Sequence, residues 1–407
     1  MSKAIAASVL ILLAAVSCEQ AAAQDQRPEI VIASDFPTSA FRTPLAMEQA
    51  IGFAIKHQTS IKSFRLRYWP LDDSLGAEQS QLRGRENARR IVADSSVLGV
   101  IGPFSSFVGQ VQIPVDNEAH LAMVSPTTTN SCLTVAQRVC LTTAASLRPT
   151  QPNNFFRIAP RDPLQGKAMA AFAATKVGLT KVAAFNEFGA EGTLYLKEFA
   201  DEFHKRGGTV VYQQDPLNDQ TVDFSEFLSQ AKAHGAEAVY AIADEDHRAC
   251  RAAVQMSVIM PGAKFLGVDG ISLEADCIKE FGDSPAAVWA TYPAVDPRTS
   301  TDQVVKQQVE AFDQAFPGAA NMYPYTFAAY DCARILIEAI RIAIAASEGG
   351  VPRRDQVVRA LAANNFVGVT GAYSFDQNGD AQHPMMSMYT VKGGAWVNVP
   401  LDPSWDS

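Results

Sequence analysis

Two loops rich in small hydroxylated residues are the first stretch of this sequence whose side chains could bind a ligand. The loop GPFSS follows the apolar run Leu98 to Ile101, and the loop SPTTT follows the apolar run Leu121 to Val124. Each run has the length of a buried strand, and residues 107–120 between them are long enough for a crossover helix, which predicts a βαβ unit. Ligands of such units settle beyond the carboxyl ends of the parallel strands, so both loops should line one crevice. Hydroxyl groups and the N–H groups at a helix start suit an anion such as a carboxylate, which makes five residues candidates: Ser105, Ser106, Thr127, Thr128 and Thr129.

A second set of polar residues follows three predicted strands in the second half of the chain. Asn186 follows KVAAF, Asp244 follows VYAIA and Asp269 follows FLGV. An acid at this edge can pair with an ammonium group, whereas the hydroxylated loops contain no acid. A ligand with a carboxylate at one end and an ammonium at the other, as in a free amino acid, matches both sets. The competing interpretation of each Ser, Thr or Asp is a helix cap or a turn.

Patterns for catalysis or for a resident metal are missing from the sequence. It contains no G-x-S-x-G, H-E-x-x-H, G-x-x-x-x-G-K-[ST] or G-x-G-x-x-G pattern, and its six histidines are scattered without metal spacing. The stretch DQNGD at 376–380 invites a calcium-loop interpretation, but an Asn-Gly turn explains it better because the remaining ligands of such a loop are missing. We therefore expect a binding protein without enzymatic activity and without a cofactor.

The composition limits the possible partners. The 407 residues are 47% hydrophobic and 19% charged, which is typical of a globular chain longer than one ordinary domain. The net charge of -9 argues against nucleic acid and against an anionic membrane surface, because neither attracts an acidic protein.

The N-terminal residues have the layout of a secretory signal peptide. Lys3 precedes an apolar run at 4–16, and small residues end the segment at Ala23. This predicts cleavage after residue 23 and export to the periplasm. A lipoprotein anchored through Cys18 is the alternative.

The remaining cysteines suit an oxidising compartment. Cys132 and Cys140 flank a short segment and form the first candidate disulfide, and Cys250 with Cys277 forms the second, although connectivity cannot be deduced from spacing alone. Cys332 falls in an apolar helical pattern, which favours a buried free thiol.

Strand-like and helix-like segments alternate along the chain from residue 29 to about residue 292, interrupted at 148–160 by a stretch rich in proline and asparagine. This alternation predicts an α/β fold with two doubly wound parallel-sheet lobes. The stretch at 148–160 marks a boundary between them.

Several of these stretches resemble one family. IGPFSS, a proline-containing helix and MVSPTTTNSCLT are similar to the N-terminal lobe of the periplasmic solute-binding proteins for leucine, isoleucine and valine, which have the type I fold and feed ABC importers. The terminal segment 370–399 also resembles that family. The resemblance implies a signal peptide at 1–23, an N-terminal lobe of 24–156 plus 294–370, and a C-terminal lobe of 157–293 plus 371–407, with the first hinge strand near Phe156 to Pro160.

The resemblance also implies roles for single residues. Ser106, Thr127 and Thr129 match positions where family members hold the ligand's α-carboxylate, and Asp269 stands where the branched-chain binders have a Glu on the α-ammonium. Asp keeps that charge but is one methylene shorter.

Two departures from the family pattern leave the ligand open. Asp244 replaces a family tyrosine, and Phe188 stands where many members carry the tyrosine of Tyr-Gly. The loop with Phe36, Phe41 and Arg42 could line the side-chain pocket. Its walls could be Phe104, Phe107 and Tyr292, with core packing as the competing role for each aromatic ring.

The sequence thus predicts a monomeric, extracytoplasmic solute-binding protein that delivers a small zwitterionic ligand, an amino acid, to the membrane permease of an ABC importer. Three alternatives stay open: a ligand-sensing module for a membrane receptor, a binder of an amide, urea, cationic or carboxylate ligand, and an exported hydrolase.

Overall fold

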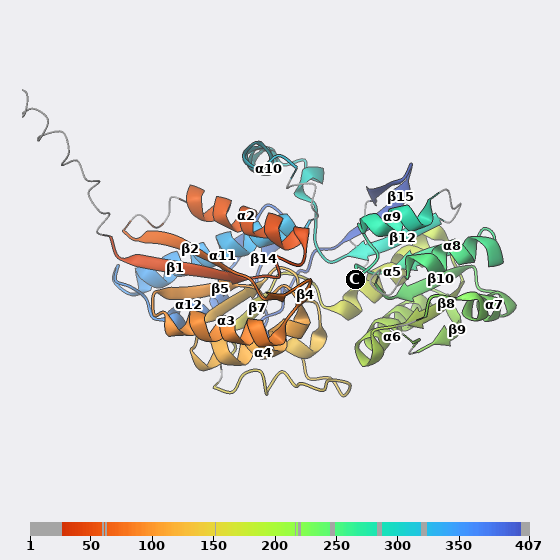
Figure 1. Ribbon diagram of the computed structural model, residues 1–407, viewed down its shortest axis with the longest axis horizontal. Helices are drawn as coiled ribbons and strands as arrows, with labels where there is room; N and C mark the ends of the chain where they lie inside the picture. Colours follow the sequence, from red (N-terminus) through yellow and green to blue (C-terminus); the bar gives the residue numbers. More distant parts are fainter. Residues whose placement is uncertain are drawn as a thin grey trace, which may run out of the picture.

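The computed structural model describes residues 27–58, 61, 63–150, 152–215, 217–218, 221–244, 249–282, 287–318 and 324–399. The predicted signal peptide and Cys18 lie outside these residues. The described chain forms two bodies side by side, each built on its own sheet (Figure 1).

The first sheet has five parallel strands in the order β2-β1-β5-β6-β7. Its central strands are continuous apolar runs because helices cover both faces. Helices α3 and α4 pack on one face, and α2, α11 and α12 pack on the other. The strands are β1 (Glu29–Asp35), β2 (Arg65–Leu71), β5 (Val97–Ile101), β6 (Ala122–Ser125) and β7 (Phe155–Arg157). The helices are α2 (Arg42–His57), α3 (Gln81–Ala93), α4 (Ser106–Glu118), α11 (Tyr325–Ala346) and α12 (Arg354–Ala363).

The second sheet has the order β16-β15-β12-β11-β10-β8-β9, in which β15 pairs antiparallel with both of its neighbours, β12 and β16, and all other pairs are parallel. Helices α5 and α6 cover one face, and α7, α8 and α9 cover the other. The strands are β8 (Lys181–Asn186), β9 (Thr209–Gln214), β10 (Ala238–Ile242), β11 (Lys264–Gly267), β12 (Ala287–Tyr292), β15 (Ser387–Lys392) and β16 (Ala395–Val399). The helices are α5 (Asp162–Phe172), α6 (Gly189–Lys205), α7 (Ser225–Ala233), α8 (Cys250–Ile259) and α9 (Ala275–Phe281).

The remaining elements are short or peripheral. They are the hairpin β3 (Ser74–Leu75) and β4 (Glu78–Gln79), the pair β13 (Phe366–Val367) and β14 (Ala372–Tyr373), helix α10 (Gln303–Ala315), the 3-10 turns η1 (Ser131–Leu133) and η3 (Pro297–Thr299), and the π-helical turn η2 (Ala173–Val177).

The chain passes between the two sheets three times: from β7 to α5, from β12 to α10, and from β14 to β15. The α/β fold class with two parallel-sheet lobes is therefore confirmed, and the lobe boundaries stay a prediction. The segment 376–380 forms a turn in which Gly379 has a φ of 88° and the Asp376 carboxylate accepts the backbone N–H groups of Asn378 and Asp380.

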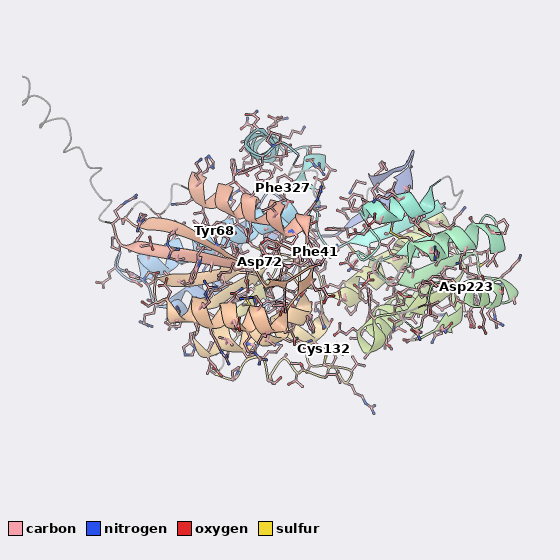
Figure 2. The ribbon with its side chains drawn as sticks, in the orientation of Figure 1. Phe41, Tyr68, Asp72, Cys132, Asp223 and Phe327 are labelled. Atoms are coloured by element: carbon pink, nitrogen blue, oxygen red, sulfur yellow. A yellow bond between two sulfur atoms is a disulfide. The ribbon has the colours of Figure 1, made fainter. Side chains whose placement is uncertain are left out.

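Both predicted disulfides are present, Cys132–Cys140 after β6 and Cys250–Cys277 between α8 and α9. Figure 2 labels Cys132. Cys332 is a buried free thiol in α11, as predicted. Within the described residues, none of the helices has the length and apolar character needed to cross a bilayer. The same residues contain no group of three His, Cys, Asp or Glu side chains placed to hold a metal ion.

Candidate functional site

The two hydroxylated loops lie side by side because their strands, β5 and β6, are neighbours in the first sheet. Ser105 is the N-cap of α4, and its Oγ accepts a hydrogen bond from the N–H of Val108 at 3.2 Å. Ser106 is the first residue of α4, and its Oγ accepts the N–H of Asn130 at 3.2 Å. Because that bond uses a lone pair, the hydroxyl hydrogen of Ser106 can still be donated to a ligand.

Thr127 and Thr128 are buried, and their hydroxyl groups bind within the loops. Thr127 Oγ1 donates to the carbonyl of Phe104 at 2.6 Å, and Thr128 Oγ1 donates to Ser125 Oγ at 2.9 Å. A hydroxyl has one hydrogen, so Thr127 uses its hydrogen to join the two loops, and Thr128 uses its hydrogen within its own loop. Thr129 is less buried; its carbonyl accepts the N–H of Asp162 at 2.9 Å, and its side chain hydrogen-bonds the Asp162 carboxyl.

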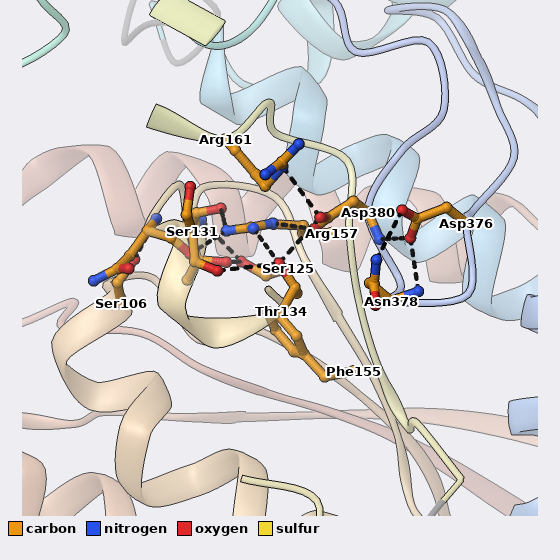
Figure 3. Close-up of polar contacts among 12 residues, drawn as sticks. Ser106, Ser125, Ser131, Thr134, Phe155, Arg157, Arg161, Asp376, Asn378 and Asp380 are labelled. Carbon is orange, nitrogen blue, oxygen red and sulfur yellow. Dashed lines mark hydrogen bonds and ion pairs between the residues drawn. The ribbon is translucent and has the colours of Figure 1, made fainter. Parts of the chain in front are cut away.

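A buried arginine donates hydrogen bonds to the backbone of the SPTTT loop and of the residue after it (Figure 3). Arg157, at the end of β7, has a side chain with 0% exposure. Its Nη1 donates to the carbonyls of Asn130 at 2.7 Å and of Thr128 at 3.3 Å, and its Nη2 donates to Thr134 Oγ1 at 2.5 Å. Its Nε donates to Asp380 Oδ1 at 2.7 Å, which pairs the buried charge.

Asp380 completes this group, which we call the Arg157 hub and define as Arg157, Asp380, Thr134 and Arg161. Asp380 Oδ2 accepts hydrogen bonds from Thr134 Oγ1 at 3.0 Å and lies 3.3 Å from Arg161 Nε. The hub joins the first crossing segment, the loop after β6 and the turn before β15 (Figure 3). Sequence reasoning missed it because Arg157 and Asp380 are 223 residues apart, and the turn predicted at 376–380 indicates no partner for Asp380.

On the second sheet, Asp269 follows β11 and is partly buried. Its Oδ1 accepts the Nε2 hydrogen of Gln165 at 2.8 Å, and its Oδ2 lies 3.5 Å from the hydroxyl of Tyr325, the first residue of α11. Burial raises the pKa of Asp269, and the bonds from Gln165 and the two tyrosines, Tyr195 and Tyr325, act against that rise. Asp269, the predicted anchor for the ligand's ammonium group, is therefore contacted by hydrogen-bond donors from helices of both sheets.

A second acid lies beside it. The Asp162 carboxyl, at the start of α5, accepts the Tyr195 hydroxyl at 2.9 Å, and Tyr195 also lies 3.4 Å from Asp269 Oδ1. Burial, and then the charge of Asp269, raises the pKa of Asp162 to about 7. A polar chain thus runs from Thr129 through Asp162 and Tyr195 to Asp269. The sequence signal at Asp162 is that of an ordinary helix start, an acid before Pro163, which is why it was missed.

Asn186 and Phe188 close the loop after β8. Asn186 is fully buried; its Nδ2 donates to the Gly189 carbonyl at 2.7 Å and to Asp215 Oδ1 at 2.6 Å, and its Oδ1 accepts the Phe188 N–H at 2.8 Å. These hydrogen bonds occupy both polar atoms of the Asn186 side chain, and all of their partners belong to the second lobe. Phe188 is partly buried, with its ring centroid 6.5 Å from that of Tyr195.

Asp244 is partly buried and lies in the loop next to that of Asp269. A Cβ built on Gly270 would lie 2.7 Å from Asp244 Cβ, so the loops after β10 and β11 are in contact. Asp244 therefore adds a third acid, after Asp162, in the neighbourhood of Asp269.

Phe104 lies between two other rings of the first lobe. Its centroid is 6.5 Å from Phe36, edge-on, and 6.4 Å from Phe41, stacked. Phe36 is fully buried and Phe41 is 38% exposed, so the row of rings runs from the core to the surface. Figure 2 labels Phe41 at the end of the first lobe that faces the second.

A further contact joins the loop after β6 to the second lobe. Asn130 Nδ2 donates to Glu191 Oε1 in the first turn of α6. Burial raises the pKa of Glu191, and this hydrogen bond lowers it. The hydrogen bond between Asn130 and Glu191 and the contact between Tyr325 and Asp269 bring both candidate anchors to one region between the sheets.

Comparison with known proteins gives consistent matches. A family model described as periplasmic binding protein matches residues 77–395. The Leu/Ile/Val-binding protein homolog 3 of Brucella melitensis is 30% identical over 161 residues, which are 39% of this chain and 39% of that protein. The aligned part therefore spans well under half the length of that relative.

Solved structures share the fold over nearly the whole chain. The leucine binding protein LivK of Thermotoga maritima has a TM-score of 0.71 at 21% identity, covering 92% of this chain and 99% of that one. A substrate-binding protein of an ABC transporter from Desulfitobacterium hafniense, in complex with Leu, has a TM-score of 0.72 at 18% identity, covering 91% and 100%. A solute binding protein from Rhodopseudomonas palustris, in complex with p-hydroxybenzoic acid, has a TM-score of 0.71 at 17% identity, covering 92% and 96%.

Proposed function

We propose a function from one premise: the chain belongs to the periplasmic binding protein family, whose model matches residues 77–395. On that premise the protein is an extracytoplasmic solute-binding protein without enzymatic activity. We assign it a small zwitterionic ligand, an amino acid, which it delivers to the permease of an ABC importer. Amino acids are also what the leucine-binding neighbours hold by name.

The observation that carries this proposal is the pairing of an anion-binding loop on one lobe with an acid on the other. On the first lobe, the Ser106 hydroxyl lies in the first turn of α4, where the first N–H groups have no backbone partner within the helix. On the second lobe, Asp269 has its oxygens set by Gln165 and Tyr325. The α-carboxylate binds the first set and the α-ammonium pairs with Asp269.

Ligand capture then follows from the contacts that span the lobes. The bonds Asn130–Glu191 and Tyr325–Asp269 hold the two anchors near one another. A ligand that contacts both anchors binds the closed arrangement better than an open one and shifts the population toward it. The permease would recognise that closed arrangement, and the predicted signal peptide would bring the monomeric protein to the periplasm.

The test is a thermal-shift screen of the exported protein against the amino acids, polyamines, urea, amides and short carboxylates, because a ligand of the folded state raises the melting temperature. We expect amino acids to give the largest shifts. We also expect Asp269→Asn to weaken amino-acid binding more than about 30-fold, whereas Asp276→Asn, at an exposed acid, leaves it unchanged. Silence among the amino acids, or full binding by Asp269→Asn, would overturn the assignment.

A second candidate is an aromatic carboxylate. The row of rings ending at the exposed Phe41 favours it, and one structural neighbour holds p-hydroxybenzoic acid. Such a ligand would use the carboxylate loop and a ring contact but would not need Asp269. Benzoate and 4-hydroxybenzoate in the same screen decide between the two, because Asp269→Asn should not weaken their binding.

A further inference from the structure

The amide of Gln165 is hydrogen-bonded to three polar side chains. Gln165, in α5, and Thr291, in β12, both have 0% exposure. Gln165 Nε2 donates to Asp269 Oδ1 at 2.8 Å and to the Tyr195 hydroxyl at 2.9 Å, while its Oε1 accepts the Thr291 hydroxyl at 2.7 Å. Three of the four hydrogen-bonding positions of this amide are therefore filled by side chains.

These hydrogen bonds all require the same orientation of the Gln165 amide. An ionised carboxylate only accepts hydrogen bonds, so the NH₂ end of Gln165 must face Asp269. Its Oε1 then faces Thr291, which donates. Tyr195 receives the second NH₂ hydrogen and gives its own hydrogen to Asp162 at 2.9 Å. A reversed amide would place its oxygen against the Asp269 carboxylate, which costs the bond and adds repulsion.

The two oxygens of Asp269 consequently differ. Oδ1 is bound by Gln165 at 2.8 Å from inside the second lobe. Oδ2 has the longer contact, 3.5 Å, with Tyr325 at the start of α11. The bond to Oδ1 favours this orientation of the carboxylate, in which Oδ2 is directed toward Tyr325 of the first lobe.

We propose that Gln165 is a positioning residue for the ligand's ammonium group: it holds Oδ1 of Asp269 so that Oδ2 meets the ammonium, and Thr291 fixes the amide of Gln165. This inference rests on the proposed function, because it requires Asp269 to bind an α-ammonium. It assigns selectivity for an ammonium-bearing ligand to two buried neutral residues that never touch the ligand.

The experiment compares ligands with and without the ammonium. Isothermal titration calorimetry measures the Kd of L-leucine, L-isoleucine and L-valine, and of the corresponding carboxylates without the amino group: 4-methylpentanoate, 3-methylpentanoate and 3-methylbutanoate. The full-length exported protein is compared with Gln165→Met, which keeps the volume and removes the amide, and with Thr291→Val. We expect Gln165→Met to weaken binding of the amino acids about 10- to 100-fold, and Thr291→Val about 3- to 10-fold. Binding of the carboxylates should change less than about twofold.

Gln112→Met is the matched control. Gln112 is also buried, and its amide also donates to a buried acid, Asp35, but it lies in α4 of the first lobe. It should leave the preference for the ammonium unchanged.

A general loss of packing in the two variants would weaken amino acids and carboxylates alike, and that result, or unchanged binding of all six, overturns the role of Gln165. Asp269→Asn decides the premise separately. If wild type binds no amino acid in the thermal-shift screen, or if Asp269→Asn binds amino acids as tightly as wild type, the proposed function fails and the inference fails with it.

Discussion

Replacing Asp380 by Asn tests the Arg157 hub, because it removes one charge and keeps the shape of the side chain. Arg157 would stay buried with three neutral acceptors: the carbonyls of Thr128 and Asn130, and Thr134 Oγ1. Its charge would have lost the carboxylate 2.7 Å away that pairs it. The substitution therefore leaves a desolvated charge without its partner.

The magnitude follows from burial. The Arg157 side chain is 0% exposed and that of Asp380 is 11% exposed, and removing one member of a buried pair costs about 3–5 kcal/mol. Asn retains one oxygen that can accept from Nε, so we expect a loss of about 2–4 kcal/mol in the free energy of unfolding. The contact with Arg161, whose side chain is 32% exposed, adds less than about 1 kcal/mol.

Urea denaturation at pH 7, followed by circular dichroism and by tryptophan fluorescence, measures this loss. The control is Asp276→Asn, which breaks an ion pair whose side chains are 77% and 69% exposed; it should cost less than about 0.5 kcal/mol. Hydrogen exchange should also show faster exchange of the amides at 127–130, because Arg157 holds two carbonyls of that loop. If Asp380→Asn costs no more than Asp276→Asn, the buried charge is stabilised without its partner and the reasoning is wrong.

Two other predictions concern the second lobe. Because the pKa of Asp162 is raised from 3.8 to about 7, the folded protein holds a proton there that the unfolded chain has released, so this residue's contribution to stability is lost as the pH rises through that interval. Asp162→Asn should flatten the fall in the free energy of unfolding between pH 5 and pH 7.5, and parallel curves for variant and wild type would refute this. Gly192→Ala should cost about 1–3 kcal/mol, since a Cβ there would lie 1.6 Å from Asn186 Oδ1. Gly52→Ala, whose nearest neighbour would be Tyr68 at 3.6 Å, should be neutral or stabilising by up to about 1 kcal/mol, and equal losses at the two sites would contradict the packing argument.

The sequence predicted the fold well because its evidence is local. The apolar runs at 98–101 and 121–124 became β5 and β6, and the hydroxylated loops follow them side by side. Cys132 and Cys140 are close in sequence, and they pair. In each case neighbouring residues in the chain determine the outcome.

The site was predicted less completely, because residue type does not reveal which partner a polar atom has. Thr127 and Thr128 look like ligand donors in the sequence, yet their hydroxyls bind the Phe104 carbonyl and Ser125. Gln165 carries no motif at all. Its importance depends on Thr291, 126 residues away, and that distance closes only when α5 packs on β12.

The contacts of the site divide into two classes that lobe motion would affect differently. The hydrogen bond from Arg157 to the loop after β6 lies within the body of the first sheet. The hydrogen bond from Gln165 to Asp269 lies within the body of the second. A rotation about the crossing segments would leave both unchanged, so each anchor keeps its geometry whether the lobes are apart or together. The bonds Asn130–Glu191 and Tyr325–Asp269 span the two bodies and must break when the lobes separate. Ligand binding therefore has to bring two preformed anchors together, but it does not have to order either of them. This keeps the free-energy cost of lobe closure low.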